Sequence, residues 1–464
     1  MRNVSLFVRG GTVITMNPSR EVVEDGAVAI EGTTIVAVGP RQELERSYAA
    51  GRSIDAGGSV VIPGLVNAHT HTFQNLYKGL GDDMPVLEWI VRMIFPLSAY
   101  LGKEEAAAGA ELACLEMIRS GVTCFTDSFY VHHDREAVLG VAEAAERSGL
   151  RALIARAAID QGDVPAAFKE PTDAAVRATE EAMRDWNPRS DRVQVCPEAL
   201  FTLFASPDLV AGLRDLARRH GSRFHMHAGE SIVEAREIRE RHGRSVFEYL
   251  DSIEALGPDV LLFHAVWCSQ SDTALLAERR TSISHNPVSN QYLASGIAPL
   301  TDWLARGVTV GLGTDGAASN NTQDMFETMK SAALLQKVAR LDARAVTAEQ
   351  VLEMATIGGA RALGLDDRIG SLEAGKRADL AVVSLEDVNA LPSHKPVSSL
   401  VYTCRPSDVS HVVVDGRLVL DDGEVVTMEE REVLQRGRAV ARRMVEESGT
   451  RHLLVAPRPV LISN

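Results

Sequence analysis

The stretch Ser59-Val-Val-Ile-Pro-Gly-Leu-Val-Asn-Ala-His-Thr-His71 decides the fold of this 464-residue chain. It is an apolar, strand-like run that ends in two histidines, His69 and His71, one residue apart. Side chains two residues apart on a β-strand point to the same face, so both imidazoles would converge on one point, which suits a divalent metal. The same two histidines could instead lie at the entrance to a loop, where water and backbone groups form hydrogen bonds with the imidazoles. The spacing alone therefore leaves both interpretations open.

Strand-like runs of this kind recur along the middle of the chain, separated by segments with helical periodicity. The eight runs cover residues 60–68, 121–127, 151–160, 192–200, 222–227, 259–266, 281–287 and 308–315. Strands that alternate with helices in this way predict an α/β fold, a TIM-like (β/α)8 barrel, with functional groups at the carboxyl ends of the strands. A doubly wound sheet is the alternative, but it does not naturally place polar groups at the end of nearly every strand.

Polar side chains do stand at these predicted strand ends. They are His69, His71, Asp127, Glu198, His227, Glu230, His264, Asn286 and Asp315. Several imidazoles and a carboxylate around an open position form the donor set of a catalytic metal, which lowers the pKa of bound water. The joint placement on separate strand ends favours a metal site more than any one residue does.

Two of these residues have roles open to them beyond metal binding. Glu230 is not needed as a ligand, and a carboxylate beside the bound water can carry a proton to a leaving group. His264 could orient the nucleophile or stabilise developing charge, although a lone histidine after a strand is more often a core residue. Asp315 before a glycine could be a turn residue, and spacing does not distinguish His225 from His227 as the ligand.

The two chain ends differ from the middle of the chain in their pattern of apolar and polar residues. Residues 4–58 and 378–426 contain short alternating runs broken by glycine turns, and we expect them to pair in one small β-sandwich domain. The predicted boundaries are residues 1–59 and 367–427 for the two parts of the β-sandwich, 60–366 for the barrel, and 428–464 for a C-terminal helix and tail.

Composition narrows the functional classes. The net charge of −15 and the pI near 5.4 argue against nucleic acid or an anionic membrane as the main partner. The five cysteines are scattered, as expected for reduced thiols. We find neither a signal peptide nor a run long enough to span a membrane, and expect a cytoplasmic protein.

Four motifs together resemble the amidohydrolase superfamily: Pro63-Gly-Leu-Val-Asn-Ala-His-Thr-His71, His227-x-x-Glu230, Gly313-Thr-Asp-Gly316 and Gly370-Ser-Leu-Glu-Ala-Gly-Lys-Arg-Ala-Asp379. The resemblance covers essentially the whole chain. Its branch of metal-dependent aminohydrolases, which includes methylthioadenosine/S-adenosylhomocysteine deaminases and s-triazine hydrolases, looks most similar.

This resemblance assigns roles to the predicted site. It implies that one zinc or iron ion is bound by His69, His71, His227 and Asp315. It also implies that Glu230 is the proton shuttle, that His264 acts on the water or the ring, and that Asp315 contacts the attacking hydroxide. Binuclear relatives commonly bridge two metals through a lysine on the fourth strand. The run 192–200 contains no lysine, which favours a single metal and disfavours hydrolysis of a cyclic amide.

Part of the chain resembles the deaminases that act on adenosine thioethers. The segment Gly79–Trp89 looks like their ribose-contacting segment, in which the residue matching Glu88 holds the sugar hydroxyls. Arg156 falls where those enzymes carry a substrate-facing arginine, and Asn290 ends another stretch that looks like that group. We therefore predict that Glu88, Trp89, Arg156 and Asn290 bind substrate.

Two other predicted substrate-binding residues depart from that group. Gln74 resembles the glutamine of triazine hydrolases and 8-oxoguanine deaminases, and Glu198 stands where adenosine-type enzymes keep a purine-contacting histidine. A buried polar mismatch of this kind costs about 1–3 kcal/mol. A carboxylate at position 198 suits a substrate that presents N–H donors, and the alternative is a rim carboxylate that faces water.

We therefore predict a hydrolytic deaminase with one divalent metal per chain, zinc or else iron. It would remove an exocyclic amino group from an N-heteroaromatic ring, in an adenosine thioether such as methylthioadenosine or S-adenosylhomocysteine or in a related aminopurine. The alternatives are an s-triazine hydrolase that expels chloride or an amine and, remotely, a non-catalytic binding scaffold. Relatives are commonly dimers or tetramers, so a homodimer or homotetramer is expected.

Overall fold

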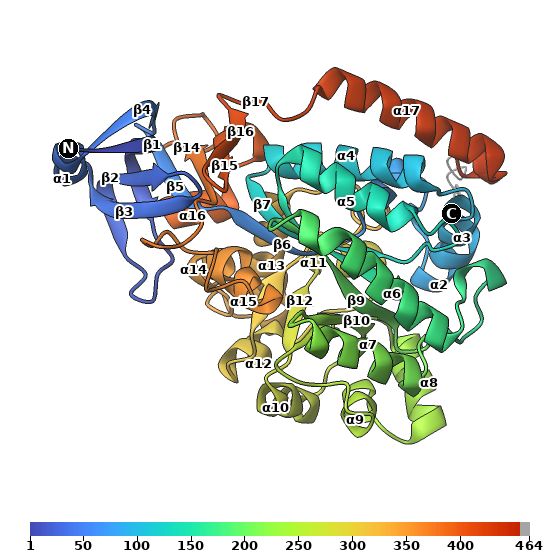
Figure 1. Cartoon of the computed structure of the whole chain (residues 1–464). Helices are drawn as coiled ribbons and strands as arrows, with labels where there is room; N and C mark the ends of the chain where they lie inside the picture. Colours follow the sequence, from blue (N-terminus) through green and yellow to red (C-terminus); the bar gives the residue numbers. More distant parts are fainter. Residues whose placement is uncertain (455–464) are drawn as a thin grey trace, which may run out of the picture.

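The computed structural model describes residues 1–454, and the predicted tail from residue 455 onward lies outside the described residues. Within residues 1–454, eight parallel strands pair side by side in sequence order and form the barrel (Figure 1). Their bounds are β6 (Leu65–Thr70), β7 (Val122–Phe129), β8 (Arg151–Ala158), β9 (Val193–Phe201), β10 (Phe224–Ala228), β11 (Val260–His264), β12 (Ser282–His285) and β13 (Val310–Leu312). The predicted (β/α)8 barrel is confirmed.

Polar side chains join the first and last barrel strands. The backbone N–H of Asp315 donates to the carbonyl of His69 at 2.9 Å. Asn67 accepts from the backbone N–H of Thr314 at 3.1 Å and donates to the Thr314 hydroxyl at 2.8 Å. Gln323 accepts from the same hydroxyl at 2.8 Å. These bonds fix the end of β6 beside the Asp315 loop, so two of the predicted metal ligands become neighbours.

Helices cover the outside of the barrel. The principal ones are α4 (Lys103–Arg119), α5 (Ala137–Ser148), α6 (Thr172–Trp186), α7 (Pro207–Arg219), α8 (Ile232–His242), α9 (Val246–Ser252), α10 (Gln270–Arg279), α11 (Pro287–Tyr292), α12 (Leu300–Ala305), α13 (Met325–Arg340), α14 (Ala348–Glu353) and α15 (Gly359–Leu363). In α7, Ser206 caps the first turn by accepting from the N–H of Leu209. The helix buries Leu209, Leu213 and Leu216 at helical spacing, which holds it against the barrel.

Both chain ends contribute to a second sheet. Within the described range it has nine strands: β1 (Arg2–Ile14), β2 (Val22–Glu31), β3 (Thr34–Pro40), β4 (Tyr48–Asp55), β5 (Ser59–Pro63), β14 (Leu380–Ser384), β15 (Val409–Val414), β16 (Arg417–Asp421) and β17 (Glu424–Val425). Its core brings Leu6 and Val8 together with Leu380 and Val413, which confirms that the chain ends pair. The residue boundaries given above for the domains stay a prediction.

The run 60–68 is two strands, so the prediction of one strand there is wrong. β5 pairs with β14 and β1 in the small sheet, whereas β6 begins at Leu65 in the barrel. Proline has no N–H for a ladder, and a Cβ on Gly64 would lie 2.0 Å from Thr123. The Pro63-Gly64 pair therefore allows the chain to pass from one sheet to the other.

The predicted C-terminal helix is present as α17 (Glu430–Glu447) and lies along α4 (Figure 1). Arg119 and Glu430 approach to 2.5 Å between the two helices. Glu111 of α4 is buried and pairs with Arg147 at 2.7 Å and with Arg436 of α17. These ion pairs fasten the end of the described chain to the barrel.

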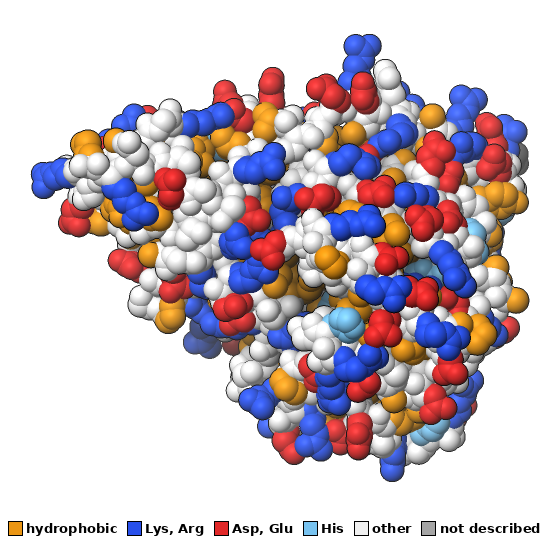
Figure 2. Space-filling model, viewed as in Figure 1, with side chains coloured by type: hydrophobic (Ala, Val, Ile, Leu, Met, Phe, Trp, Pro, Cys, Tyr) orange, Lys and Arg blue, Asp and Glu red, His pale blue; other side chains and the backbone are white. Residues whose placement is uncertain are grey.

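The remaining elements are short. They are α1 (Arg41–Ser47), α2 (Val86–Trp89), α3 (Phe95–Ser98) and α16 (Pro396–Tyr402). Figure 2 shows basic and acidic side chains interspersed over the visible face, with no broad basic region among the described residues seen there. Among the described helices, none has the length and apolar character needed to cross a membrane.

Candidate metal centre and active site

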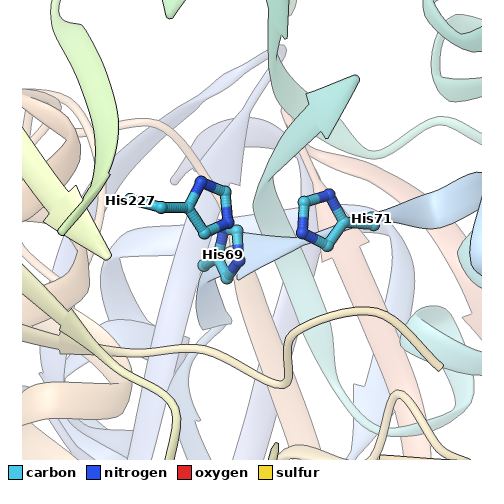
Figure 3. A group of neighbouring side chains, drawn as sticks. All are labelled: His69, His71 and His227. Atoms are coloured by element: carbon cyan, nitrogen blue, oxygen red, sulfur yellow. The ribbon is translucent and has the colours of Figure 1, made fainter. Parts of the chain in front are cut away.

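Predicted site residues meet at the carboxyl ends of the barrel strands. His69 lies in β6 and His71 directly follows it, His227 lies in β10, His264 ends β11, and Asp315 follows β13. The imidazoles of His69, His71 and His227 face a common point (Figure 3). Ligand atoms of these three residues lie within 4.8 Å of one another, as do those of His69, His264 and Asp315. The structure thus brings the four predicted metal ligands together.

Asp315 occupies the centre of this group. Its Oδ1 lies 3.3 Å from Nε2 of His69 and 3.4 Å from Nε2 of His71, and its Oδ2 lies 3.7 Å from Nε2 of His264. Asp315 and His264 adopt left-handed φ angles of 63° and 71°. Such angles cost free energy for residues other than glycine, and they cluster at functional sites.

The protonation states suit a cation between these side chains. Burial lowers the pKa of His69 to about 3, and it also lowers the pKa of His71 and of His227. These imidazoles are therefore neutral and can donate a lone pair. Burial opposes ionisation of Asp315, but the imidazole of His69, 3.3 Å away, and the other nearby imidazoles hold its pKa well below the usual range. Neutral imidazoles and one carboxylate are typical zinc ligands.

Hydrogen bonds behind the imidazoles test whether the residues fit a metal. Nδ1 of His71 donates to the Ser128 carbonyl at 2.6 Å, and Nδ1 of His227 donates to the Leu200 carbonyl at 2.8 Å, which leaves each Nε2 free. Neither ring nitrogen of His69 has a hydrogen-bond partner among the described residues. A buried imidazole without a partner is costly, and a bound cation would remove that cost. The residues fit a divalent metal.

The structure also distinguishes the two histidines of β10. His225 is fully buried and its Nδ1 lies 3.9 Å from the Cys196 sulfur, outside the group that surrounds Asp315. His227, two residues later on the same strand, is the histidine that groups with His69 and His71.

Glu230 lies in the turn between β10 and α8, and its side chain lines a cavity beside the metal centre. Glu234 holds this turn, because its carboxylate accepts the backbone N–H groups of Gly229 and Glu230, both at 2.9 Å. Burial raises the pKa of Glu230, and the charge of His264 opposes the shift. We did not predict Glu234. The available signal was a second glutamate four residues after Glu230, in the first turn of a helix.

The short helix α11 holds two active-site groups. Oδ1 of Asn290 accepts from Nδ1 of His264 at 2.9 Å, and the Ser289 hydroxyl donates to Oδ2 of Asp315 at 2.6 Å. Burial lowers the pKa of His264, but the charges of Glu230 and Asp315 and the bond to Asn290 outweigh it and raise that pKa. The structure places Asn290, predicted to bind substrate, behind His264, and it adds Ser289, which sequence reasoning missed.

The cavity combines a polar end with apolar walls. The polar end is formed by His71, His227, Glu230, His264 and Asp315. Its apolar walls include Leu87, Trp89, Ile90, Phe95, Phe201 and Phe204. They come from α2 and the turns after it, and from the end of β9 and the loop that follows. Such a cavity suits a flat heteroaromatic ring with an apolar substituent.

Two predicted substrate-binding residues line this cavity. Gln74 is buried, and its Nε2 donates to the Tyr130 hydroxyl at 3.0 Å, while its Oε1 has no partner among the described residues. Trp89 presents its ring to the cavity, and its Nε1 donates to the Ala318 carbonyl at 3.1 Å. Gln74 thus offers a free acceptor, and Trp89 offers an apolar surface.

Glu88 and Arg156 are absent from the described lining of the cavity. Glu88 is exposed and pairs with Arg92 one helical turn later, a spacing that favours an ion pair. Arg156 is buried, lies 2.7 Å from Glu170 and donates to the Thr179 hydroxyl at 3.3 Å. In this structure each charged side chain faces a protein partner, and the substrate-binding roles of Glu88 and Arg156 stay predictions.

Replacement of Arg156 by Met is expected to lower stability and leave KM unchanged. The change leaves Glu170 without its cation, and breaking such a buried pair costs about 3 kcal/mol. Thermal unfolding and steady-state kinetics measure the two effects. Arg177→Met, in α6, is the matched control for loss of an arginine. A raised KM at unchanged stability would return Arg156 to the substrate-binding set.

Glu198 is fully buried and lies neither at the rim nor in the described lining of the cavity. Its Oε1 accepts from the Ser128 hydroxyl at 2.7 Å and lies 3.2 Å from Nδ1 of His227. The alternative of a rim carboxylate that faces water is wrong, because Glu198 is fully buried and β9 directs its side chain toward His227 on β10. With no cation nearby, burial raises the pKa of Glu198 well above its usual range.

A parallel barrel with neutral imidazoles, an ionised aspartate and a Glu–His pair at its strand ends is the architecture of a metal-dependent hydrolase. The chain belongs to the amidohydrolase family: the Amidohydrolase family profile matches residues 60–419, which confirms the resemblance read from the motifs. A second profile, the imidazolonepropionase-like composite domain of bacteria, matches residues 26–50.

Curated relatives align along nearly the whole chain. A 5-methylthioadenosine/S-adenosylhomocysteine deaminase of Syntrophobacter fumaroxidans is 43% identical, with 94% of this chain and 98% of the relative covered. A 5'-deoxyadenosine deaminase of Methanosarcina acetivorans is 38% identical, with 95% and 98% covered.

Solved structures agree with this placement. An adenosine deaminase from Xanthomonas campestris with bound zinc has a TM-score of 0.91 at 31% identity, with 96% of this chain and 99% of that chain covered. An atrazine chlorohydrolase from Arthrobacter aurescens complexed with zinc has a TM-score of 0.88 at 25% identity, with 94% and 100% covered.

Proposed function

We propose that this protein is a metal-dependent deaminase that hydrolyses the exocyclic amino group of an adenosine-type nucleoside. The observation that carries the proposal is that three of the four proposed metal ligands line one cavity together with Glu230 and His264, while His69 lies within reach of those ligands. The deaminase names of the relatives support this reaction. A non-catalytic scaffold is disfavoured, because such a protein has no need of the Glu230–His264 pair.

His69, His71, His227 and Asp315 would hold a divalent metal, which would lower the pKa of water and so make a hydroxide nucleophile available at neutral pH. Glu230 takes one proton from the attacking water and passes it to the ring nitrogen, and then takes the remaining proton of the added hydroxyl and delivers it to the departing amine. His264, held by Asn290, donates a hydrogen bond that stabilises the charge developing on the new oxygen. Addition of water forms the C–O bond, and loss of ammonia breaks the C–N bond and leaves a ring carbonyl.

The apolar walls support a substrate with an apolar substituent, such as the thioether of methylthioadenosine. Leu87, Ile90 and Phe95 offer surface for that group, and Trp89 offers a face for stacking. We propose that Glu88 binds the ribose hydroxyls after it exchanges its ion pair with Arg92 for them. Both residues are exposed, so this exchange breaks only a weak interaction.

Replacement of Glu88 by Gln is therefore expected to raise KM for methylthioadenosine about tenfold, the loss of one charged hydrogen bond. kcat should change little, because the ribose is remote from the reacting carbon. Steady-state kinetics with methylthioadenosine and with adenine separate the effects, since adenine has no ribose. Glu104→Gln is the matched control on the outer helix α4. An unchanged KM for methylthioadenosine would remove Glu88 from the substrate-binding set.

A second candidate is a triazine hydrolase, favoured by the free acceptor of Gln74 and by similarity to the atrazine chlorohydrolase. One panel separates the two functions: ammonia and chloride release from methylthioadenosine, S-adenosylhomocysteine, 5'-deoxyadenosine, adenosine, guanine, 8-oxoguanine, melamine and atrazine. Ammonia from the adenosine-type nucleosides supports the first proposal. Turnover of triazines or oxopurines alone would contradict it and give Gln74 the role in specificity.

We propose one metal per chain, because the described fourth strand of the barrel, β9, contains no lysine to bridge a pair. Elemental analysis of the purified protein is expected to give about one zinc or iron ion per chain, because the proposed ligands form a single metal-binding site. Two tightly bound ions per chain would contradict a mononuclear site. The oligomeric state and the cytoplasmic location stay predictions.

A further inference from the structure

Glu198 is a buried carboxylate that contacts His227 directly and is linked to His71 through Ser128. Its Oε1 lies 3.2 Å from Nδ1 of His227 and accepts from the Ser128 hydroxyl at 2.7 Å. The carbonyl of the same Ser128 accepts from Nδ1 of His71 at 2.6 Å. The Glu198 carboxylate and Ser128 therefore connect Nδ1 of His227, in β10, with Nδ1 of His71, directly after β6.

Strand β9 orients His227 at two points. The Leu200 carbonyl lies 2.8 Å from Nδ1 of His227, and the Glu198 carboxylate lies 3.2 Å from the same nitrogen. Both acceptors face Nδ1, so the proton stays there and Nε2 keeps its lone pair for the group formed with His69 and His71. Metal-binding histidines commonly donate their other N–H to a carboxylate or carbonyl, which fixes the tautomer and raises ligand basicity.

The charge balance of the site points in the same direction. Glu198 is 0% exposed, and its Oε2 has no hydrogen-bond partner among the described residues. A buried carboxylate is costly unless a positive charge compensates it. A divalent cation bound by His227 would supply that compensation through the imidazole that Glu198 contacts at 3.2 Å.

We propose that Glu198 is a positioning residue of the metal centre that fixes His227 directly and His71 through Ser128. This inference rests on the proposed metal site. It replaces the earlier prediction that Glu198 reads the substrate, and it explains why a carboxylate occupies the interior of β9.

Zinc affinity of Glu198→Gln, measured by competition with a chromogenic chelator, tests the proposal. The variant keeps the shape of the side chain and removes its charge, and we expect zinc to bind about 10–100-fold more weakly. The absorption spectrum of the cobalt-loaded variant should also change, because His227 loses a partner. Glu198→Asp, which keeps the charge, should recover part of the affinity. Glu111→Gln, which removes a buried carboxylate on α4 away from the site, should bind zinc as the wild type does.

Wild-type zinc affinity and an unaltered cobalt spectrum in Glu198→Gln would overturn the proposal, and a raised KM in that case would return Glu198 to substrate recognition. If Glu198→Gln fails to fold, Ser128→Ala serves instead. It removes only the hydroxyl and keeps the carbonyl that binds His71, so weaker zinc binding is again expected and wild-type binding would overturn the proposal. If the zinc-loaded wild type releases no ammonia from the adenosine-type nucleosides, the proposed function is refuted, and the zinc-affinity test of Glu198 is still valid.

Discussion

Replacement of Glu230 by Gln is expected to lower kcat for ammonia release by about 10²–10⁴-fold, the usual contribution of a general acid–base group. Glutamine keeps the size of the side chain but cannot take a proton from water or deliver one to the leaving amine. The metal content should stay at the wild-type level, since Glu230 is not one of the grouped metal-binding residues. Steady-state ammonia assays and elemental analysis measure the two quantities.

Glu237→Gln is the matched control for this experiment. Glu237 lies in α8, the helix that follows Glu230, and pairs with Arg241 on its surface. Its removal should leave kcat unchanged. Near-normal turnover by Glu230→Gln would show that another group carries the proton, and the proposed mechanism would then be wrong.

Removal of the metal is expected to abolish turnover and to destabilise the fold. A ligand that binds only the folded state stabilises it by about 4 kcal/mol at a free concentration of 1,000 times Kd. Chelation should therefore lower Tm in addition to stopping ammonia release, and added zinc should restore both. Differential scanning calorimetry and the ammonia assay record these changes on one sample.

His69→Ala should resemble the chelated protein and should not recover when zinc is added. His69 belongs to both groups of ligand atoms, and its two nitrogens have no hydrogen-bond partner among the described residues, so they are available to a metal. His242→Ala, at the exposed end of α8, is the control and should bind zinc normally. Full activity and an unchanged Tm after chelation would contradict a metal-dependent site.

The barrel could be predicted from the sequence because each strand is a short apolar run with a polar end. The passage from β5 to β6 could not, because Ser59–Pro63 and Leu65–Thr70 have the same apolar character and differ only in their partners. β13 is shorter than its predicted run 308–315, because the chain leaves the ladder at Gly313 to place Asp315 at the centre.

The grouping of the proposed metal ligands could also be predicted, because the carboxyl ends of the barrel strands bring the residues at those positions close together. Longer side chains depend on tertiary partners that a pattern does not contain. Glu88 faces Arg92, Arg156 faces Glu170, and Asn290 faces His264, and the sequence pattern does not show any of these partners. Glu198 was placed on the correct strand, but its direction into the barrel depends on Ser128 and His227.

The most direct test is one turnover of methylthioadenosine by the zinc-loaded protein in water labelled with heavy oxygen, followed by mass spectrometry of the product and assay of ammonia. We predict one ammonia released for each product formed, with the label in the new ring carbonyl, because water adds to the carbon that loses its amino group. Methylthioadenosine recovered unchanged, or a product that retains the amino nitrogen, would contradict the proposed deaminase.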